Sequence, residues 1–288
     1  GIQSQPTLLD TDTKLAFIER LIDAGVRRIE AASFVNPKRV PQMADVDELV
    51  RRLPRRDGVR FIGLVLNRRG FERAAHSGID QINCTTVASE TFCQRNQGAS
   101  VGEMYAVIAD IVREAQATKM FCGVTIAASF GCPFEGEVAP ARVRDMVRQF
   151  ADLGVDEIAL ADSIGVAVPS DVRRLLELAG PVVGDIPLRV HFHDTRNTGV
   201  ANVCAAVEAG VRIIDASCGG VGGCPFAPGA TGNVATEDVL YVLQRMGFAT
   251  GIDIAKIIAT TKWLEGPLGT AMPAMVSRAG VFPPAVTA

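Results

Sequence analysis

A short pattern that occurs four times along the chain limits its fold more than any other sequence feature. In each copy a helix-like segment ends, a glycine follows, and an apolar segment begins; the copies lie at residues 23–26, 76–79, 152–155 and 208–211. Glycine is a common helix terminator because it adopts the left-handed backbone conformation without steric cost. The irregular spacing of the copies argues against a solenoid repeat. The pattern therefore predicts repeated helix-to-strand connections and a parallel sheet.

The predicted strands and helices alternate along the chain. The strands are expected at residues 27–32, 60–66, 81–87, 121–128, 157–161, 188–192 and 212–216. The helices are expected at residues 11–24, 40–53, 70–76, 101–119, 141–153, 170–179, 198–209, 236–246 and 253–264. The strands are apolar along most of their length, which is typical of a sheet that is covered on both faces.

Polar residues at the ends of the predicted strands distinguish a barrel from an open sheet. An open doubly wound sheet gathers its site residues at one switch point, whereas a (β/α)8 barrel takes them from every strand end. Seven different strand ends carry such a residue: Glu30, Asn67, Glu90, Ser129, Asp162, His193 and Asp215. We therefore predict an α/β fold of the (β/α)8 TIM-barrel type.

The extent of the predicted barrel follows from the same count. Because the sequence shows only seven strands, the first strand of the barrel is expected before Gly1. Residues 1–270 are predicted to form the TIM-barrel catalytic domain. Residues 271–288 are predicted to form a proline-rich C-terminal tail.

Composition excludes several classes of function. The chain has 288 residues and a net charge of -3, so a nucleic-acid-binding or membrane-surface role, which needs a clustered basic face, is not expected. No apolar run reaches the ~18 residues of a membrane span. Seven cysteines without short paired spacing are typical of reduced thiols, so we expect a cytoplasmic protein. The excess of arginine over lysine suggests a bacterial source.

A glycine-rich segment, residues 219–233, follows the last predicted strand and reads GGVGGCPFAPGATGN. Its glycines allow the backbone to approach a ligand closely, and its prolines stiffen the turns. Cys224 is a candidate catalytic thiol in this segment. The alternative is that Cys224 is only a small buried apolar residue, which is the more usual role of a free cysteine.

Two histidines form the second candidate site. In His191-Phe192-His193 the alternation of a strand puts both imidazoles on one face, from which they can reach one metal ion. Asn233 can add a neutral oxygen, and this mixture of ligands suits Mg, Mn, Co or Zn. The alternative is one packed histidine and one that faces solvent. A zinc site with four histidines is excluded, because His76 is the only other one and lies on a predicted surface helix.

Two acidic residues at strand ends, Glu30 and Asp162, are candidate acid–base or ligand groups. Each has a structural alternative, because a carboxylate in such a place often caps the following loop or pairs with an arginine.

Several longer motifs, taken together and in order, resemble the 3-hydroxy-3-methylglutaryl-CoA lyase family. The match runs from Gly1 to about Gly247. The motifs are EAASFVNPKRVPQMAD at residues 30–45, GCPFEG at 131–136, ADSIGV at 161–166, HFHDT at 191–195 and GGVGGCPFAPGATGNVATED at 219–238.

The resemblance implies a metal-dependent TIM-barrel lyase, from a superfamily that also holds isopropylmalate and homocitrate synthases. By position, His191, His193 and Asn233 match metal ligands, Cys224 matches the catalytic cysteine, and Glu30 and Asp162 match acidic site residues. The family's remaining ligand is an aspartate in an Arg-Asp motif, which is expected in the residues just before Gly1. The implied metal is Mg²⁺ or Mn²⁺, and a homodimer is expected.

The reaction that the resemblance implies is the cleavage of 3-hydroxy-3-methylglutaryl-CoA, or a close 3-hydroxyacyl-CoA, to acetyl-CoA and acetoacetate. His191 or a neighbouring group would take the hydroxyl proton, and Cys224 would protonate the enolate that bond cleavage leaves. Arg196-Asn197-Thr198 replaces the Tyr-Gly-Gln that is usual in the family, which leaves the acyl group open. The alternatives are a condensing synthase of the same superfamily that uses acetyl-CoA, and a metal- or CoA-binding barrel without catalysis.

Overall fold

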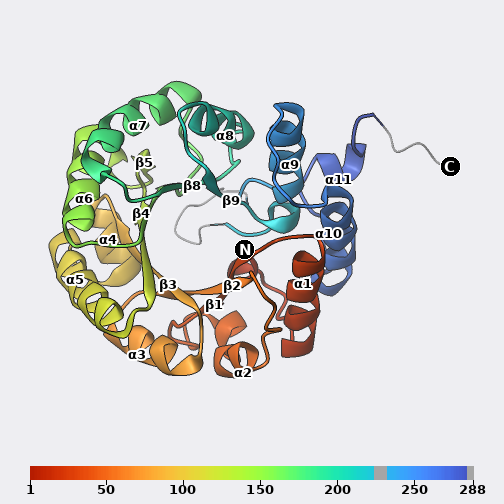
Figure 1. The fold of residues 1–288 in the computed structure, drawn as a ribbon, viewed down its shortest axis with the longest axis horizontal. Coiled ribbons are helices and arrows are strands. Elements are labelled where there is room, and N and C mark those ends of the chain that lie inside the picture. The colour runs from red at the N-terminus through yellow and green to blue at the C-terminus, as the bar shows by residue number, and fades with distance from the viewer. Residues whose placement is uncertain (224–231, 284–288) are drawn as a thin grey trace.

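A curved sheet of seven parallel strands lies at the centre of the computed structural model, which describes residues 1–223 and 232–283. Figure 1 shows the strands curling into an incomplete ring with the helices outside it. In order across the sheet, the strands are β1 (Arg28–Ser33), β2 (Arg60–Val65), β3 (Gln81–Val87), β4 (Phe121–Ala127), β7 (Glu157–Asp162), β8 (Leu188–Phe192) and β9 (Ile213–Asp215). The predicted α/β class and parallel sheet are confirmed.

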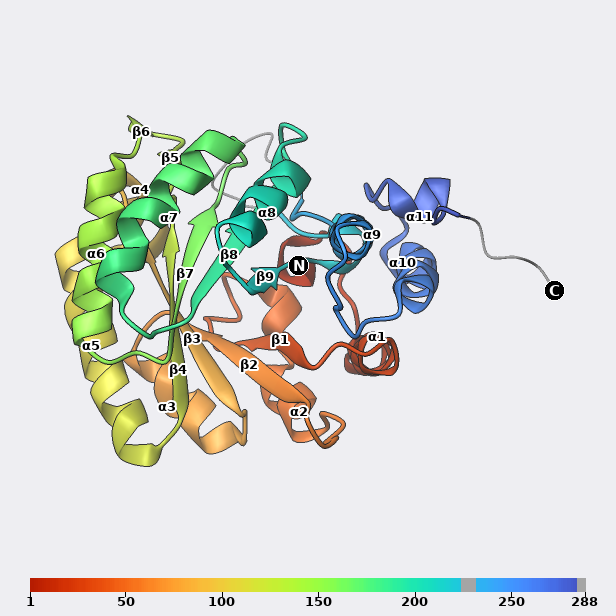
Figure 2. The same ribbon diagram turned by 45° about the horizontal axis from the view of Figure 1, so that its top comes forward.

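Helices follow most strands and cover the outer face of the sheet (Figures 1 and 2). The α-helices are α1 (Thr11–Asp23), α2 (Val46–Arg51), α3 (Arg68–Ser77), α4 (Glu90–Gln97), α5 (Val101–Thr118), α6 (Pro140–Asp152), α7 (Pro169–Val183), α8 (Gly199–Glu208), α9 (Thr236–Arg245), α10 (Ile254–Leu268) and α11 (Val276–Ala279). Three short 3₁₀ turns are η1 (Ile2–Ser4), η2 (Pro41–Met43) and η3 (Cys218–Gly220). An antiparallel pair, β5 (Gly131–Cys132) and β6 (Gly136–Glu137), completes the described elements.

The four glycines of the repeated pattern all have the backbone conformation that the pattern predicts. Their φ angles are 101° at Gly25, 81° at Gly78, 73° at Gly154 and 98° at Gly210. At Gly25 a side chain is also excluded by space, because a Cβ there would lie 2.4 Å from the carbonyl oxygen of Gly251. The helix-to-strand connections are therefore placed correctly by the sequence.

The predicted helix at residues 40–53 is wrong, because the chain there forms η2 and then α2. Lys14 of α1 explains the interruption. Its ammonium group, which is almost fully buried, donates to the Gln42 carbonyl oxygen at 2.6 Å and to the Asp45 carboxylate at 2.6 Å. A continuous helix would use that carbonyl within its own ladder, so the buried lysine competes successfully for it.

The elements that were not predicted from the sequence are helices α4 and α11, the turns η1 and η3, and the β5–β6 pair. Helix α4 buries only Phe92 and Cys93, so its apolar period is too weak to recognise, although Ser89 caps it by accepting from the Phe92 N–H. The β strands of the pair have two residues each, which is too short for any alternation to show.

The edges of the sheet are β1 and β9 among the described residues, and Gly1 lies close to β9. A Cβ on Gly1 would come within 2.6 Å of Ser217 Oγ. The predicted further strand concerns residues before Gly1 and stays a prediction, as does the domain boundary at residue 270. None of the helices in the described ranges is long and apolar enough to cross a membrane.

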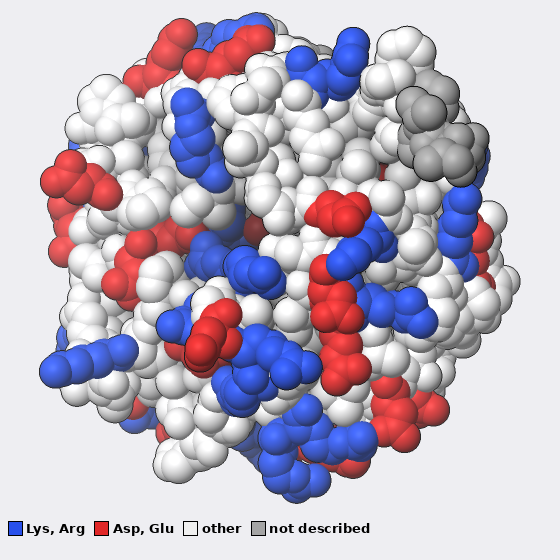
Figure 3. Space-filling view, turned by 45° about the vertical axis from the view of Figure 1, so that its right-hand side comes forward, with Lys and Arg blue, Asp and Glu red and all other residues white. Residues whose placement is uncertain are grey.

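The apolar core lies between the sheet and the helices. Phe61, Phe150 and Phe192 are among its fully buried side chains. The outer surface mixes the two signs of charge: Figure 3 shows basic side chains lying among acidic ones on one face. Exposed pairs such as Arg52 with Asp12 and Glu48 belong to this surface and contribute little stability individually.

The space around two glycines predicts opposite effects on stability when each is replaced by alanine. A Cβ on Gly63 would lie 2.5 Å from the ring of Phe34, which is buried, whereas a Cβ on Gly102 of α5 would meet nothing within 4 Å. We expect Gly63→Ala to lower the free energy of unfolding by about 1–3 kcal/mol through overpacking. We expect Gly102→Ala to raise it by up to about 1 kcal/mol.

Urea unfolding of both variants checks this prediction. If Gly63→Ala were as stable as the unmodified protein, the close packing of Phe34 against β2 would be contradicted.

Candidate active site

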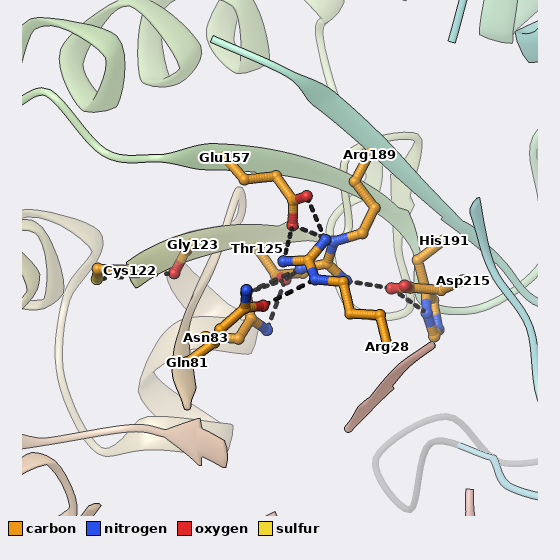
Figure 4. Close-up of polar contacts among 10 residues, drawn as sticks. All are labelled: Arg28, Gln81, Asn83, Cys122, Gly123, Thr125, Glu157, Arg189, His191 and Asp215. Carbon is orange, nitrogen blue, oxygen red and sulfur yellow. Dashed lines mark hydrogen bonds and ion pairs between the residues drawn. The ribbon is translucent and has the colours of Figure 1, made fainter. Parts of the chain in front are cut away.

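The two histidines of the predicted site lie together at the carboxyl end of β8. Their ring centroids are 5.3 Å apart, as expected for positions two residues apart on one face of a strand. His193 is 5% exposed, whereas His191 is only partly buried. Figure 4 shows His191 beside Asp215, within the concave side of the sheet.

His193 is held in the form that can bind a metal ion. Burial, together with the neighbouring His191, lowers the pKa of His193 to about 3, so the imidazole is neutral at physiological pH. Its Nδ1 atom is buried and has no hydrogen-bond partner in the described part of the chain. A buried polar atom without a partner is costly, and a ligand atom at this position would remove that cost.

The backbone around Asn233 is joined to the end of β8. Residues His193 and Asn233 form an isolated antiparallel bridge, and the Val234 N–H donates to the Phe192 carbonyl oxygen at 3.0 Å. The Asn233 side chain donates from Nδ2 to the Val221 carbonyl oxygen at 3.0 Å. Its amide oxygen is therefore the end that remains for a cation. The structure thus brings the two histidines together and joins the backbone of Asn233 to His193.

Asp215 of β9 connects His191 to the interior of the barrel. Its Oδ2 lies 3.3 Å from His191 Nδ1 and also forms an ion pair with Arg189. Burial opposes ionisation of Asp215, but Arg189 and His191 together outweigh it and lower the pKa of Asp215 to about 2. Because Asp215 occupies the Nδ1 side of His191, the Nε2 side is the one left for substrate or metal.

A network of charged and polar side chains lies beside His191 and Asp215 on the inner face of the sheet (Figure 4). Arg189 donates to Glu157 Oε1 at 2.8 Å and to Asn83 Oδ1 at 2.9 Å. Arg28 of β1 pairs with the same Glu157 carboxylate at 2.5 Å. Arg189 and Glu157 are nearly inaccessible to water, with side-chain exposures of 6% and 2%. TIM barrels usually fill this space with layers of branched apolar residues, so this interior is unusual for the fold.

The sequence analysis did not single out Arg189, Glu157 or Arg28. A signal for Arg189 exists in the sequence, because residues 189, 191 and 193 alternate with apolar residues on one strand. All three must therefore share the inner face. No comparable signal exists for Glu157, since only the three-dimensional neighbourhood of β7 and β8 shows that it faces Arg189.

Glu30 lies near this network, on β1. Its pKa is raised because surrounding protein removes water from the carboxyl group and because Asp215 is also negative; Arg189 and His191 partly offset this effect. The side chain nevertheless remains exposed to solvent. The structure therefore places Glu30 within electrostatic reach of His191 and leaves it accessible to a ligand.

Asp162 occupies a different environment from the other predicted acid. It pairs in register with Phe192, which points toward the helices, and not with the neighbouring His191. Its carboxylate accepts from the Val166 N–H at 3.1 Å and the Ala167 N–H at 2.9 Å. Burial raises the pKa of Asp162, and these N–H groups partly offset the effect. The structural alternative, capping of the next loop, is therefore observed, and a catalytic role for Asp162 stays a prediction.

The remaining candidates divide between structural roles and an undescribed segment. Asn67 caps α3 by accepting from the Gly70 N–H, and Glu90 accepts from the Val101 N–H. Neither is therefore brought to the histidines by an observed contact. Cys224 lies outside the described residues, between Gly223 and Gly232.

The donor set tests whether a metal ion fits this site. In residues 1–223 and 232–283, no group of three or more His, Cys, Asp and Glu side chains is arranged to hold a metal ion. The two imidazoles do lie together, the backbone of Asn233 is bridged to His193, and His193 Nδ1 lacks a partner in the described part of the chain. The residues present therefore fit part of a mixed nitrogen and oxygen ligand set.

Comparisons with known proteins find relatives that span almost the whole chain. The family model described as HMGL-like matches residues 1–264. The (R)-citramalyl-CoA lyase of Chloroflexus aurantiacus is 41% identical over 100% of this chain and 94% of its own length. The hydroxymethylglutaryl-CoA lyase of Pseudomonas mevalonii is 40% identical over 94% of this chain and 90% of its own length.

Solved structures give the same result. An HMG-CoA lyase from Acinetobacter baumannii, in complex with coenzyme A and 3-methylmalate, superimposes with a TM-score of 0.94 at 37% identity. The match covers 98% of this chain and 92% of that chain. The hydroxymethylglutaryl-CoA lyase of Pseudomonas aeruginosa has a TM-score of 0.93 at 35% identity, over 97% of this chain and 93% of that one.

The charged network predicts a large effect of removing Arg189. Replacing it by methionine leaves the buried carboxylate of Glu157 and the partly buried carboxylate of Asp215 without their shared partner. We expect Arg189→Met to cost about 3–5 kcal/mol of unfolding free energy. Arg113→Met, which removes an exposed pair with Asp110, is the control and should cost less than about 1 kcal/mol. Similar values for the two variants in chemical denaturation would contradict the buried network.

The anchoring of Asp162 predicts a local change when it becomes asparagine. The amide can accept from one of the two N–H groups, at Val166 and Ala167, but its NH₂ group then faces the other. We expect amide hydrogen exchange at these two residues to become about tenfold faster or more. Asp171→Asn, which affects the Val168 N–H, is the matched control and should leave Ala167 unchanged.

Proposed function

The chain belongs to the HMGL-like family of carbon–carbon lyases, and from that premise we propose that it cleaves 3-hydroxy-3-methylglutaryl-CoA, or a close 3-hydroxyacyl-CoA, to acetyl-CoA and a keto acid. The observation that carries the proposal is the meeting of His191, His193 and Asn233 at one end of β8. Two relatives that are named as lyases of CoA thioesters further support a thioester substrate.

His191, His193 and the amide oxygen of Asn233 would hold a divalent metal ion, with Mg²⁺ or Mn²⁺ as the proposed species. Such an ion would supply Lewis-acid chemistry, lowering the pKa of the substrate hydroxyl group. The neutral state of His193 and the orientation of His191 by Asp215 suit them to this role without rearrangement.

A separate group must take the hydroxyl proton, because an imidazole nitrogen that binds a metal cannot accept a proton as well. We assign this role to Glu30, which is exposed and has a raised pKa. A carboxylate with a raised pKa is a better base at neutral pH than an ordinary one. Its transfer of the proton from oxygen accompanies cleavage of the bond between C2 and C3, whose electron pair moves into the thioester enolate.

Cys224 is the proposed acid for the second proton transfer. Its S–H group would give a proton to C2 of the enolate, which forms the methyl group of acetyl-CoA, and the thiolate would then recover a proton from solvent. General-acid assistance of this kind contributes about 10²- to 10⁴-fold to a rate.

Citramalyl-CoA is the second candidate substrate. It differs from 3-hydroxy-3-methylglutaryl-CoA by one methylene between C3 and the carboxylate, and its cleavage gives pyruvate in place of acetoacetate. A full-length relative that is 41% identical bears the name of its lyase. Arg196, held by the carbonyl oxygens of Ile164 and Gly165 at 3.0 Å each, stands where the family usually has tyrosine. One methylene typically changes the specificity ratio by about 10- to 200-fold, so the two substrates are distinguishable.

We also propose that the protein is a homodimer, as the resemblance implies, and that it is cytoplasmic, as the unpaired spacing of its cysteines indicates.

The experiment measures acetyl-CoA release from each of the two thioesters, with added Mg²⁺ or Mn²⁺ and after treatment with a chelator. We expect metal-dependent release that falls by about 10²-fold or more in Cys224→Ala. Cys204→Ala, at a partly exposed thiol on α8, is the matched control and should keep full activity. The identity of the keto acid, acetoacetate or pyruvate, assigns the substrate.

Three outcomes would contradict the proposal. Release that persists with chelator would remove the metal role, and full activity of Cys224→Ala would remove the acid role. Condensation of acetyl-CoA with a keto acid, without measurable cleavage, would favour the synthase alternative.

A further inference from the structure

The turn η3, at the start of the glycine-rich segment, lies directly against Asn233. The Val221 carbonyl oxygen, just after the turn, accepts from Asn233 Nδ2 at 3.0 Å. A Cβ on Gly220 would lie 3.2 Å from the Asn233 carbonyl oxygen. The position of this turn therefore determines where the side chain of Asn233 is held.

The other side of the turn is covered by residues 272–278, near the C-terminal end of the described chain. Met272 and Ala274 are 3% and 1% exposed. The Ala274 N–H donates to the Gly219 carbonyl oxygen at 3.3 Å. A Cβ on Gly219 would lie 2.8 Å from Met272 Cγ, so the segment and the turn are packed without space for a methyl group.

The buried carboxylate of Glu237 also connects the turn η3 to residues 272–278. Glu237, at the start of α9, is 0% exposed. Its Oε2 accepts from the Gly219 N–H at 3.0 Å, and its Oε1 accepts from Ser277 Oγ at 2.5 Å and Thr261 Oγ1 at 2.6 Å. The turn, α10 and α11 therefore share one acceptor group.

Residues 272–278 are also fixed by contacts that do not involve the turn. Asp238 accepts from the N–H groups of Met275 and Val276 at 3.1 and 2.7 Å, and Glu265 accepts from the Met272 N–H at 2.9 Å. Figures 1 and 2 both show α11 beside α9 and α10. These contacts hold the segment in place independently of the turn. The segment can therefore support η3.

We propose that residues 272–278 are a positioning element of the active site: they fix η3, and through Val221 they hold the amide of Asn233 next to His193. The catalytic part of this inference rests on the proposed function. Misplacement of a ligand or catalytic group by about 1 Å can cost about 10²-fold in rate, so loosening this support should reduce turnover even though no residue of the segment touches the substrate.

The test compares Met272→Ala and Ser277→Ala with Met275→Ala. Met275 belongs to the same segment but is 64% exposed, so its variant should behave like the unmodified enzyme. For Met272→Ala and Ser277→Ala we expect kcat to fall by about tenfold or more, with a much smaller change in KM. We also expect faster amide hydrogen exchange at Gly219 and Ala274, while β3 and β4 keep their protection.

Hydrogen exchange separates this inference from the proposed function, since it needs no turnover. Faster exchange at Gly219 with unchanged kcat in an active enzyme would overturn the positioning role. Unchanged exchange in both variants would overturn the structural support itself. If Met272→Ala loses protection throughout the sheet, the milder Ser277→Ala decides, because it removes one hydroxyl and leaves the packing intact. Absence of cleavage by the unmodified enzyme would contradict only the proposed function.

Discussion

The ion pairing of Arg189 inside the barrel is the interaction on which the candidate site depends. Its guanidinium group joins Glu157 of β7 to Asp215 of β9, and it also binds Asn83 of β3. A buried guanidinium must keep its partners, because leaving any of these charges unpaired is costly. This requirement fixes Asp215, and Asp215 in turn orients His191. The geometry of His191 thus depends on a layer of buried charge on the neighbouring strands.

Much of the fold was predictable because its signals are local. A glycine with positive φ ends each helix of the repeated pattern, and β3 and β8 begin and end at the predicted residues. The errors have two causes, one long-range and one local. Lys14 donates to the Gln42 carbonyl oxygen, which interrupts a segment that was predicted to be helical. No sequence signal near residue 42 indicates this contact. Helix α4 was missed because only Phe92 and Cys93 of it are buried.

The candidate site was predictable where strand alternation or a recognisable motif applied. His191 and His193 follow the period of two, and Asn233 belongs to a motif that the family resemblance supplied. Asp162 shows the limit of this reasoning: being at a strand end does not say which face a side chain takes, and its register with Phe192 places it away from the histidines. The contact of Arg189 with Glu157 and that of Gly219 with Glu237 join residues that are far apart in sequence. These contacts could be recognised only in the folded structure.

The packing of residues 272–278 under Gly219 also has a consequence for the order of events during synthesis. A ribosome releases the chain from its N-terminal end, so strands β1 to β9 can pair before this segment exists. Until Met272 and Ser277 have emerged, Gly219 lacks both the apolar surface below it and one of the groups that share Glu237. The barrel strands can therefore pair early in a nascent chain, whereas the side-chain amide of Asn233 reaches its final place only after residues 272–278 have emerged.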